Sequence, residues 1–119
     1  MISRLYRFHG YNALRFVYKQ GRTVRIEGAP FTLRYVANPR RQQYRLAVVV
    51  SKKQSKSAVV RNRIRRRLYE AGRELLTDRA GALDLVLSVT DERVATMDKK
   101  DINKTILRFL QIIKPGEGR

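Results

Sequence analysis

The chain of 119 residues contains no cysteine, no tryptophan and a single histidine, His9. Without cysteine it can form neither a disulfide nor a thiolate metal site, and His9 has no nearby cluster of candidate ligands. Only ten acids are scattered among 27 lysines and arginines. They supply no group of carboxylates or histidines that could hold a metal ion or move protons in a protein nuclease. The sequence therefore predicts no metal site and no catalytic constellation of that kind.

Long hydrophobic segments are missing as well. The longest purely apolar run is Leu46 to Val50, far short of the roughly 20 residues needed to cross a bilayer. The first residues are charged where a signal peptide would need an apolar stretch, so we expect a cytoplasmic protein with no membrane partner. The length and the 43% content of hydrophobic residues predict a single domain over residues 1–119, with a flexible tail at about residues 114–119.

Positive charge is what the chain has in excess, with a formal net charge of +17. Residues 1–50 carry ten bases and one acid, residues 51–73 carry nine bases and one acid, and residues 74–119 carry eight of each. A compact domain with so much charge of one sign repels itself unless a polyanion neutralises it. The predicted partner is therefore nucleic acid.

Apolar periodicity and turn residues predict elements in the order α-β-β-β-α-β-α. The expected helices and strands are Tyr11 to Gln20, Thr23 to Glu27, Phe31 to Ala37, Tyr44 to Val50, a helix that follows Ser57, Leu83 to Val89, and residues 98–113. We expect the first three strands to form an antiparallel meander. The run Leu46 to Val50 is apolar at every position, which favours a central strand covered on both faces.

The helix after Ser57, which is a suitable N-cap, is amphipathic. Its apolar face should consist of Val60, Ile64, Leu68, Ala71 and Leu75. The opposite side should carry Arg61, Asn62, Arg65, Arg66, Tyr69 and Arg73, with Arg63 and Arg67 flanking the apolar stripe. Because no acid interrupts the bases between Lys56 and Arg67, we favour a phosphate-binding face over a merely solvated one.

Three segments resemble the protein subunit of bacterial ribonuclease P: Phe16 to Gly21, Val50-Ser51-Lys52-Lys53 and the arginine-rich block Ala58 to Leu68. The order of elements fits that family over nearly the whole chain. The resemblance implies an α+β two-layer sandwich like a ribosomal-protein domain, with a four-stranded mixed sheet. It also implies a left-handed crossover through the arginine-rich helix, where the general rule for parallel strands would predict a right-handed one.

The implied function is that of the protein component of ribonuclease P, which removes the 5′ leader of precursor tRNA by phosphodiester hydrolysis. In that family a large catalytic RNA performs the chemistry with bound Mg²⁺. The resemblance therefore implies no catalytic residue and no cofactor on the protein itself, while the holoenzyme requires Mg²⁺ through its RNA. The partners would be the catalytic RNA and precursor tRNA, with no obligate protein partner.

The resemblance also implies two RNA surfaces. The first would grip the catalytic RNA through Lys52, Lys53, Lys56, Arg61, Asn62, Arg63, Arg65 and Arg66. Arginine suits this task because its planar fork binds phosphate oxygens bidentately. Capping, turn and intrahelical roles compete with RNA contact at Asn62.

The second surface would be a cleft between the first helix and the sheet, receiving the single-stranded leader at Leu14, Arg15, Tyr18, Arg34 and Tyr35. Aromatic stacking suits single strands of any sequence. Leu14 and Arg34 stand where the family has aromatics, and Tyr35 is displaced by one position, toward the opposite face of the strand. Either the register slips locally, or Arg34 replaces stacking with phosphate or guanidinium contact.

Other functions are compatible with parts of the sequence. A ribosomal or ribosome-assembly protein would need the same charge but would not prefer precursor over mature tRNA. A self-sufficient nuclease lacks its carboxylate cluster, and a membrane-surface binder lacks an apolar face not required by the core. Asp84, on a predicted strand, is interpreted as a solvent-facing or salt-bridged residue without a catalytic role.

Overall fold

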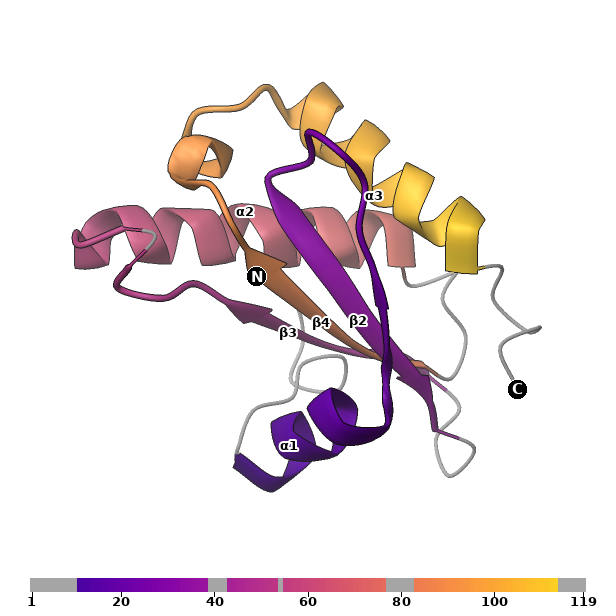
Figure 1. The fold of residues 1–119 in the computed structure, drawn as a ribbon. Helices are drawn as coiled ribbons and strands as arrows, with labels where there is room; N and C mark the ends of the chain where they lie inside the picture. Colours follow the sequence, from indigo (N-terminus) through magenta and orange to yellow (C-terminus); the bar gives the residue numbers. More distant parts are fainter. Residues whose placement is uncertain (1–10, 39–42, 54, 77–82, 114–119) are drawn as a thin grey trace.

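The computed structural model describes residues 11–38, 43–53, 55–76 and 83–113, without the side chains of residues 11–14. The elements are α1 (Tyr11–Gln20), β1 (Arg22–Val24), β2 (Phe31–Ala37), β3 (Arg45–Val49), α2 (Ala58–Leu76), β4 (Leu83–Val89), the short 3₁₀ helix η2 (Glu92–Ala95) and α3 (Lys99–Ile113), as drawn in Figure 1. The predicted order of helices and strands is confirmed, although η2 was not foreseen and β1 is shorter than expected. The predicted flexible tail lies outside the described residues.

The four strands form one sheet in the order β1-β2-β4-β3. β2 pairs antiparallel with both β1 and β4, and β3 pairs parallel with β4. The predicted meander is therefore wrong beyond its first hairpin, because β4 lies between β2 and β3. α2 connects the two parallel strands β3 and β4. The left-handed sense expected for this crossover stays a prediction.

The apolar strand β3 lies at an edge of the sheet and not at its centre, which corrects the second topological expectation. Its side chains are nevertheless buried on both faces: Leu46 and Val48 belong to the main core, and Ala47 packs with Val17 and Val86 on the other side. A continuous apolar run reports burial on two faces. It carries no information on how many strand neighbours the backbone has.

Helices α2 and α3 cover one face of the sheet, and α1 lies against the other (Figure 1). The predicted sandwich is present in the sheet with α2 and α3, and α1 adds partial cover to the second face. On α3 the predicted inward residues are all buried: Ile102, Ile106, Phe109, Leu110 and Ile113. Each such side chain contributes roughly 1.5–3 kcal/mol by leaving water.

The arginine-rich helix α2 begins as predicted, with the Ser57 hydroxyl accepting a hydrogen bond from the N–H of Val60 at 3.3 Å. Of its predicted apolar face, Ile64, Leu68 and Ala71 are buried, and the two end residues are partly buried against the same core. The helix therefore presents one face to the core and leaves the other for its arginines.

Tyr69 is the exception to the two faces predicted for α2. It is buried, not turned toward the arginine face, and its hydroxyl accepts a hydrogen bond from the N–H of Val48 at 3.1 Å. The phenol places an apolar ring in the core while its polar end satisfies a backbone donor. Assigning residues to helix faces with tyrosine counted as polar cannot anticipate this arrangement.

The turn between α1 and β1 depends on Gly21. Its N–H donates to the carbonyl of Val17 at 2.7 Å. A Cβ at this position would lie 2.4 Å from the Val17 carbonyl oxygen and 2.8 Å from that of Tyr35, closer than side chains tolerate. Glycine therefore lets the end of α1 lie directly against β2, and this contact sets the position of α1 on the sheet.

Candidate nucleic-acid interface

The predicted bases of the first surface lie on α2 and on the segment that leads into it. Lys52, Lys53, Lys56, Asn62, Arg63 and Arg66 are exposed, and Arg61 and Arg65 are partly exposed. Within the described part of the chain, none of these side chains forms a salt bridge. The helix thus presents positive charge that no acid of the described residues neutralises.

Two of these arginines are oriented by neighbouring groups. Arg61 donates from Nη1 to the carbonyl of Ser55 at 2.8 Å, and Arg65 donates from Nη1 to Oδ1 of Asn62 at 3.0 Å. Asn62 therefore has an intrahelical partner and remains exposed beside it. Each guanidinium keeps several N–H donors beyond the one used. Both side chains can therefore still bind phosphate while these hydrogen bonds hold them in place.

Arg66 and Arg67 are adjacent but lie in different surroundings. Arg66 is exposed, whereas Arg67 is partly buried and donates from Nη1 to the carbonyl of Val94 at 2.7 Å and from Nη2 to the carbonyl of Met97. Arg67 therefore fixes η2 and the residues after it against α2.

The second predicted surface lies around α1, β2 and β4. Tyr18 is 41% exposed, and its hydroxyl shares a hydrogen bond of 3.4 Å with Oγ of Ser88. Arg34 donates from Nη1 to the carbonyl of Tyr18, and its guanidinium carbon lies 5.3 Å from the centroid of the Tyr18 ring. Arg15 and Phe16 are exposed on the same helix. The surface combines aromatic rings and cations, the mixture that binds single-stranded nucleic acid.

The register of β2 decides between the two alternatives for this surface. Arg34 faces α1, while Tyr35 is buried in the core on the opposite side of the sheet. Tyr35 is therefore not part of the surface, which corrects its predicted role in leader binding: adjacent residues of a strand point to opposite faces. Of these two residues, it is Arg34 that lies on the α1 side of the sheet, beside Tyr18. The Leu14 side chain lies outside the described residues.

Asp84 is salt-bridged and fully buried, at 1% exposure. Arg45 donates to its carboxylate from Nε at 2.9 Å and from Nη2 at 2.8 Å, and Asn38 donates from Nδ2 at 3.0 Å. The hydrogen bond to Asp84 raises the pKa of Arg45 above its usual value, against the effect of burial. The carboxylate is committed to joining β3 and β4, and no substrate could reach it.

The described residues contain no group of three or more histidine, cysteine, aspartate or glutamate side chains placed to hold a metal ion. Among the same residues, no helix is both long and apolar enough to cross a membrane. The described structure does assemble two basic surfaces: the exposed cations between Lys52 and Arg66, and the aromatic and basic residues of α1 with Arg34 of β2.

Comparison with known proteins decides the family. A family model described as Ribonuclease P matches residues 2–114. The chain belongs to the ribonuclease P protein family. It is 38% identical over 66 residues to the ribonuclease P protein component of Pseudanabaena sp. (strain PCC 6903), a match that covers 56% of this chain and 57% of that protein. The matched segment thus spans little more than half the length of that relative.

Solved structures of the ribonuclease P family have the same fold. The RNase P protein of Staphylococcus aureus superposes with a TM-score of 0.76 at 26% identity, over 92% of this chain and 95% of that one. The RNase P protein of Thermotoga maritima superposes with a TM-score of 0.73 at 21% identity, over 84% and 90% of the two chains. The α+β fold with a four-stranded mixed sheet, implied by the resemblance, is confirmed.

Proposed function

We propose that this chain acts as the protein component of ribonuclease P, binding the catalytic RNA with α2 and the 5′ leader of precursor tRNA with the α1 surface. The observation that carries the proposal is the basic surface from Lys52 to Arg66, whose predicted RNA-binding cations have no salt-bridge partner among the described residues. Family membership supplies the reaction class: endonucleolytic removal of the leader, with the hydrolysis performed by the RNA and its Mg²⁺.

The arginines of α2 bind and orient the RNA without taking part in bond cleavage. Arg61 and Arg65 are held by Ser55 and Asn62, so their forks lose less freedom when they meet phosphate. Neutralising RNA phosphates also reduces the repulsion between RNA segments, and less Mg²⁺ is then required to fold and dock them. The catalytic RNA is the proposed partner of this face.

The α1 surface provides the preference for precursor over mature tRNA. A base of the leader stacks on Tyr18, while Arg15 and Arg34 lie beside it and attract the phosphates. Mature tRNA has no leader and gains nothing from these contacts. Both surfaces act through phosphate neutralisation, so log affinity should fall with log salt at a slope of roughly −0.7 per neutralised phosphate of a single strand.

The test is cleavage of precursor tRNA at low Mg²⁺ by bacterial ribonuclease P RNA, with and without the purified chain, using leaders of increasing length. We expect stimulation that grows with leader length. Replacing Arg61, Arg65 and Arg66 together by alanine should abolish it. The matched control removes three exposed cations from α3 by replacing Lys100, Lys104 and Arg108 with alanine, and this variant should retain stimulation.

Two results would overturn the proposal. Tight RNA binding without stimulation, and without preference for precursor, would favour a ribosomal or ribosome-assembly protein. Cleavage by the purified chain in the absence of RNA would make it a nuclease in its own right. The cytoplasmic location expected from the sequence stays a prediction.

A further inference from the structure

A basic groove of about 490 Å³ lies between α2 and the segment that follows β4. Its α2 side is formed by Arg63, Arg66 and Arg67, and its other side by residues 95–97, at the end of η2. Residues 95–97 belong to neither of the two predicted RNA surfaces. The groove therefore adds to the arginine helix a wall that the sequence did not predict.

Three guanidinium groups line this groove, and no carboxylate is among its lining residues. Arg63 and Arg66 are exposed, and none of the three arginines forms a salt bridge within the described residues. Arg67 is partly buried and donates to the carbonyls of Val94 and Met97, which orient its guanidinium without supplying a counter-charge. Like charges that line one groove repel each other, so the groove favours an anion.

The acids that lie near these residues in the sequence do not enter the groove. Glu70 lies one turn beyond Arg66 on α2, but it is not part of the lining, and its Oε2 atom is 3.1 Å from Nη2 of Arg73. Asp98 follows Met97 directly and does not line the groove either. No carboxylate of the lining therefore competes with an incoming anion for the arginines.

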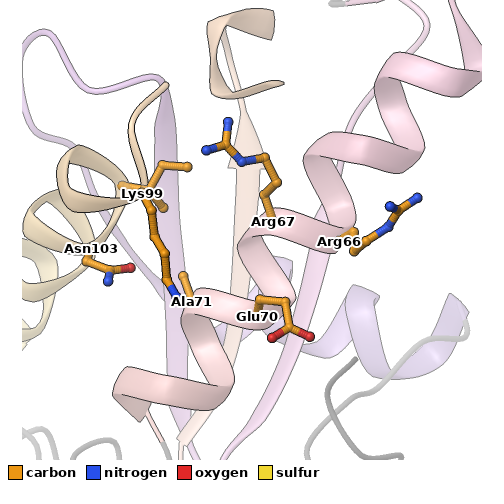
Figure 2. A pocket seen from close by; sticks show the side chains of 7 residues that line it. Arg66, Arg67, Glu70, Ala71, Lys99 and Asn103 are labelled. Atoms are coloured by element: carbon orange, nitrogen blue, oxygen red, sulfur yellow. The ribbon is translucent and has the colours of Figure 1, made fainter. Parts of the chain in front are cut away.

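A neighbouring cavity of about 230 Å³ between α2 and α3 shares Arg66 and Arg67 with the groove but differs in charge. Figure 2 shows Glu70 and Lys99 in its lining, together with Asn103, whose buried Oδ1 atom has no hydrogen-bond partner among the described residues. The Glu70 carboxylate would repel a phosphate in that cavity. An anion is therefore favoured on the η2 side of the two arginines and not on the α3 side.

We propose that the groove binds one ribose-phosphate unit of the catalytic RNA, with the phosphate between Arg63 and Arg66 and the sugar against Ala95 and Met97. The inference rests on the proposed function, because that function supplies the RNA. Arg67 is a positioning residue in this arrangement: its two hydrogen bonds hold the wall formed by residues 95–97 against α2. The end of η2 thereby becomes part of the RNA interface.

Geometry and size both favour a phosphate together with its sugar. Residues three apart on a helix lie on the same side, with about 5–6 Å between their Cβ atoms, so the forks of Arg63 and Arg66 can bind one phosphate together. The groove volume of about 490 Å³ lies within the roughly 300–1,000 Å³ of small-molecule sites, which leaves room beyond the phosphate itself. Ala95 and Met97 are partly buried and supply apolar atoms to the lining.

The test places a negative charge in the groove without changing any arginine. Thr96 is exposed and lines the groove beside the three arginines. Thr96→Glu should weaken binding of bacterial ribonuclease P RNA at least about tenfold, the effect of losing one charge-assisted contact. The melting temperature of the free protein should stay equal or rise, because the new carboxylate neutralises part of the arginine charge. Filter binding at low salt and thermal denaturation measure the two quantities.

The matched control Gln111→Glu introduces the same charge at an exposed position of α3 and should change RNA affinity less than about twofold. Thr96→Val loses the hydroxyl and its hydrogen bond of 3.3 Å to the carbonyl of Arg93 but adds no charge, so it should bind RNA like the parent. High salt should bring the affinities of the two glutamate variants together, since salt screens the added charge. Equal affinities at low salt would overturn the inference, as would an equal loss for Thr96→Val.

A free anion is distinguished from RNA by competition. Millimolar inorganic phosphate, added at constant ionic strength, should not displace the RNA from the parent protein. Displacement by phosphate that Thr96→Glu abolishes would identify a site for the free anion and overturn the assignment to RNA.

Failure of this inference is distinguishable from failure of the proposed function. If the chain stimulates precursor cleavage and Thr96→Glu binds RNA as tightly as Gln111→Glu, the proposed function stands and the groove is not an RNA site. If Thr96→Glu selectively weakens RNA binding but the parent chain does not stimulate cleavage, the groove stands as an RNA site and the proposed function is wrong.

Discussion

The guanidinium of Arg34 stacks over the ring of Tyr18, 5.3 Å from its centroid, and also donates to the Tyr18 carbonyl. A cation over an exposed aromatic face contributes about 0.5–1 kcal/mol. The pair joins β2 to the end of α1 and fixes the ring where a leader base would stack. Arg34 thus orients the Tyr18 ring, and the proposed function also makes it a phosphate partner.

Replacing Tyr18 by alanine should lower affinity for leader-bearing precursor by about 1–3 kcal/mol, the value of one stacked base. Binding of mature tRNA should not change, because it has no leader. Fluorescence titration of the two RNAs against the assembled holoenzyme measures the difference. Tyr18→Phe keeps the ring and loses only the long hydrogen bond to Ser88, so it should resemble the parent; equal losses for both RNAs would contradict the assignment.

The free energy of unfolding should depend on the ion pair between the buried Asp84 carboxylate and the partly exposed Arg45 guanidinium. Asp84→Asn leaves Arg45 without its counter-ion, and we expect a loss of about 3 kcal/mol, the lower end of the range for buried pairs, because water still reaches the guanidinium. Glu74→Gln is the control, because its pair with Lys99 is exposed and should contribute no more than about 1 kcal/mol. Urea denaturation compares the two variants.

A double variant shows whether that loss reflects an uncompensated charge. Replacing Asp84 and Arg45 together by leucine and methionine removes both charges, and it should recover much of the lost stability. A double variant as unstable as Asp84→Asn would instead indicate that the ion pair itself holds β3 against β4.

The hydroxyl of Tyr69 is expected to stabilise the edge strand β3. Tyr69→Phe preserves the buried ring but leaves the N–H of Val48 without this acceptor, so the free energy of unfolding should fall by about 1–3 kcal/mol. Amide hydrogen exchange at Val48 should accelerate more than exchange at Leu46. An unchanged exchange rate at Val48 would show that the bond contributes nothing.

The success of the sequence predictions depended on how local each signal was. The inward face of α3 followed from spacing alone, as for Ile102 and Ile106, because one side of that helix meets one surface. The start of α2 at Ser57 was equally local, since a capping hydroxyl bonds within its own turn. Such features need no knowledge of the rest of the chain.

Features that depend on distant partners were missed. The apolar run in β3 could not reveal that β4 would enter the sheet beside it, and the polarity of Tyr69 could not reveal a hydrogen bond to a strand 21 residues away. The side of the sheet on which Arg34 lies depends on the register of β2. The unpaired Oδ1 atom of Asn103 becomes evident only once α3 is packed against the rest of the fold. Each of these is a property of packing and not of a segment.

The neighbours Arg66 and Arg67 should separate RNA binding from stability. Arg67→Met removes the donors to the carbonyls of Val94 and Met97. We expect the free energy of unfolding to fall by at most about 1.5–3 kcal/mol for each of these two charged hydrogen bonds. Arg66→Met removes an exposed cation and should leave the free energy of unfolding within about 0.5 kcal/mol of the parent.

RNA affinity should show the reverse order for these two variants. Arg66→Met should reduce the slope of log affinity against log salt by roughly 0.7–0.9, the contribution of one phosphate, whereas Arg67→Met should leave that slope unchanged once the protein is folded. Thermal denaturation and filter binding over a series of salt concentrations measure both quantities on the same preparations. If Arg67→Met alone altered the salt slope, Arg67 would have to bind phosphate directly, in addition to holding η2 in place.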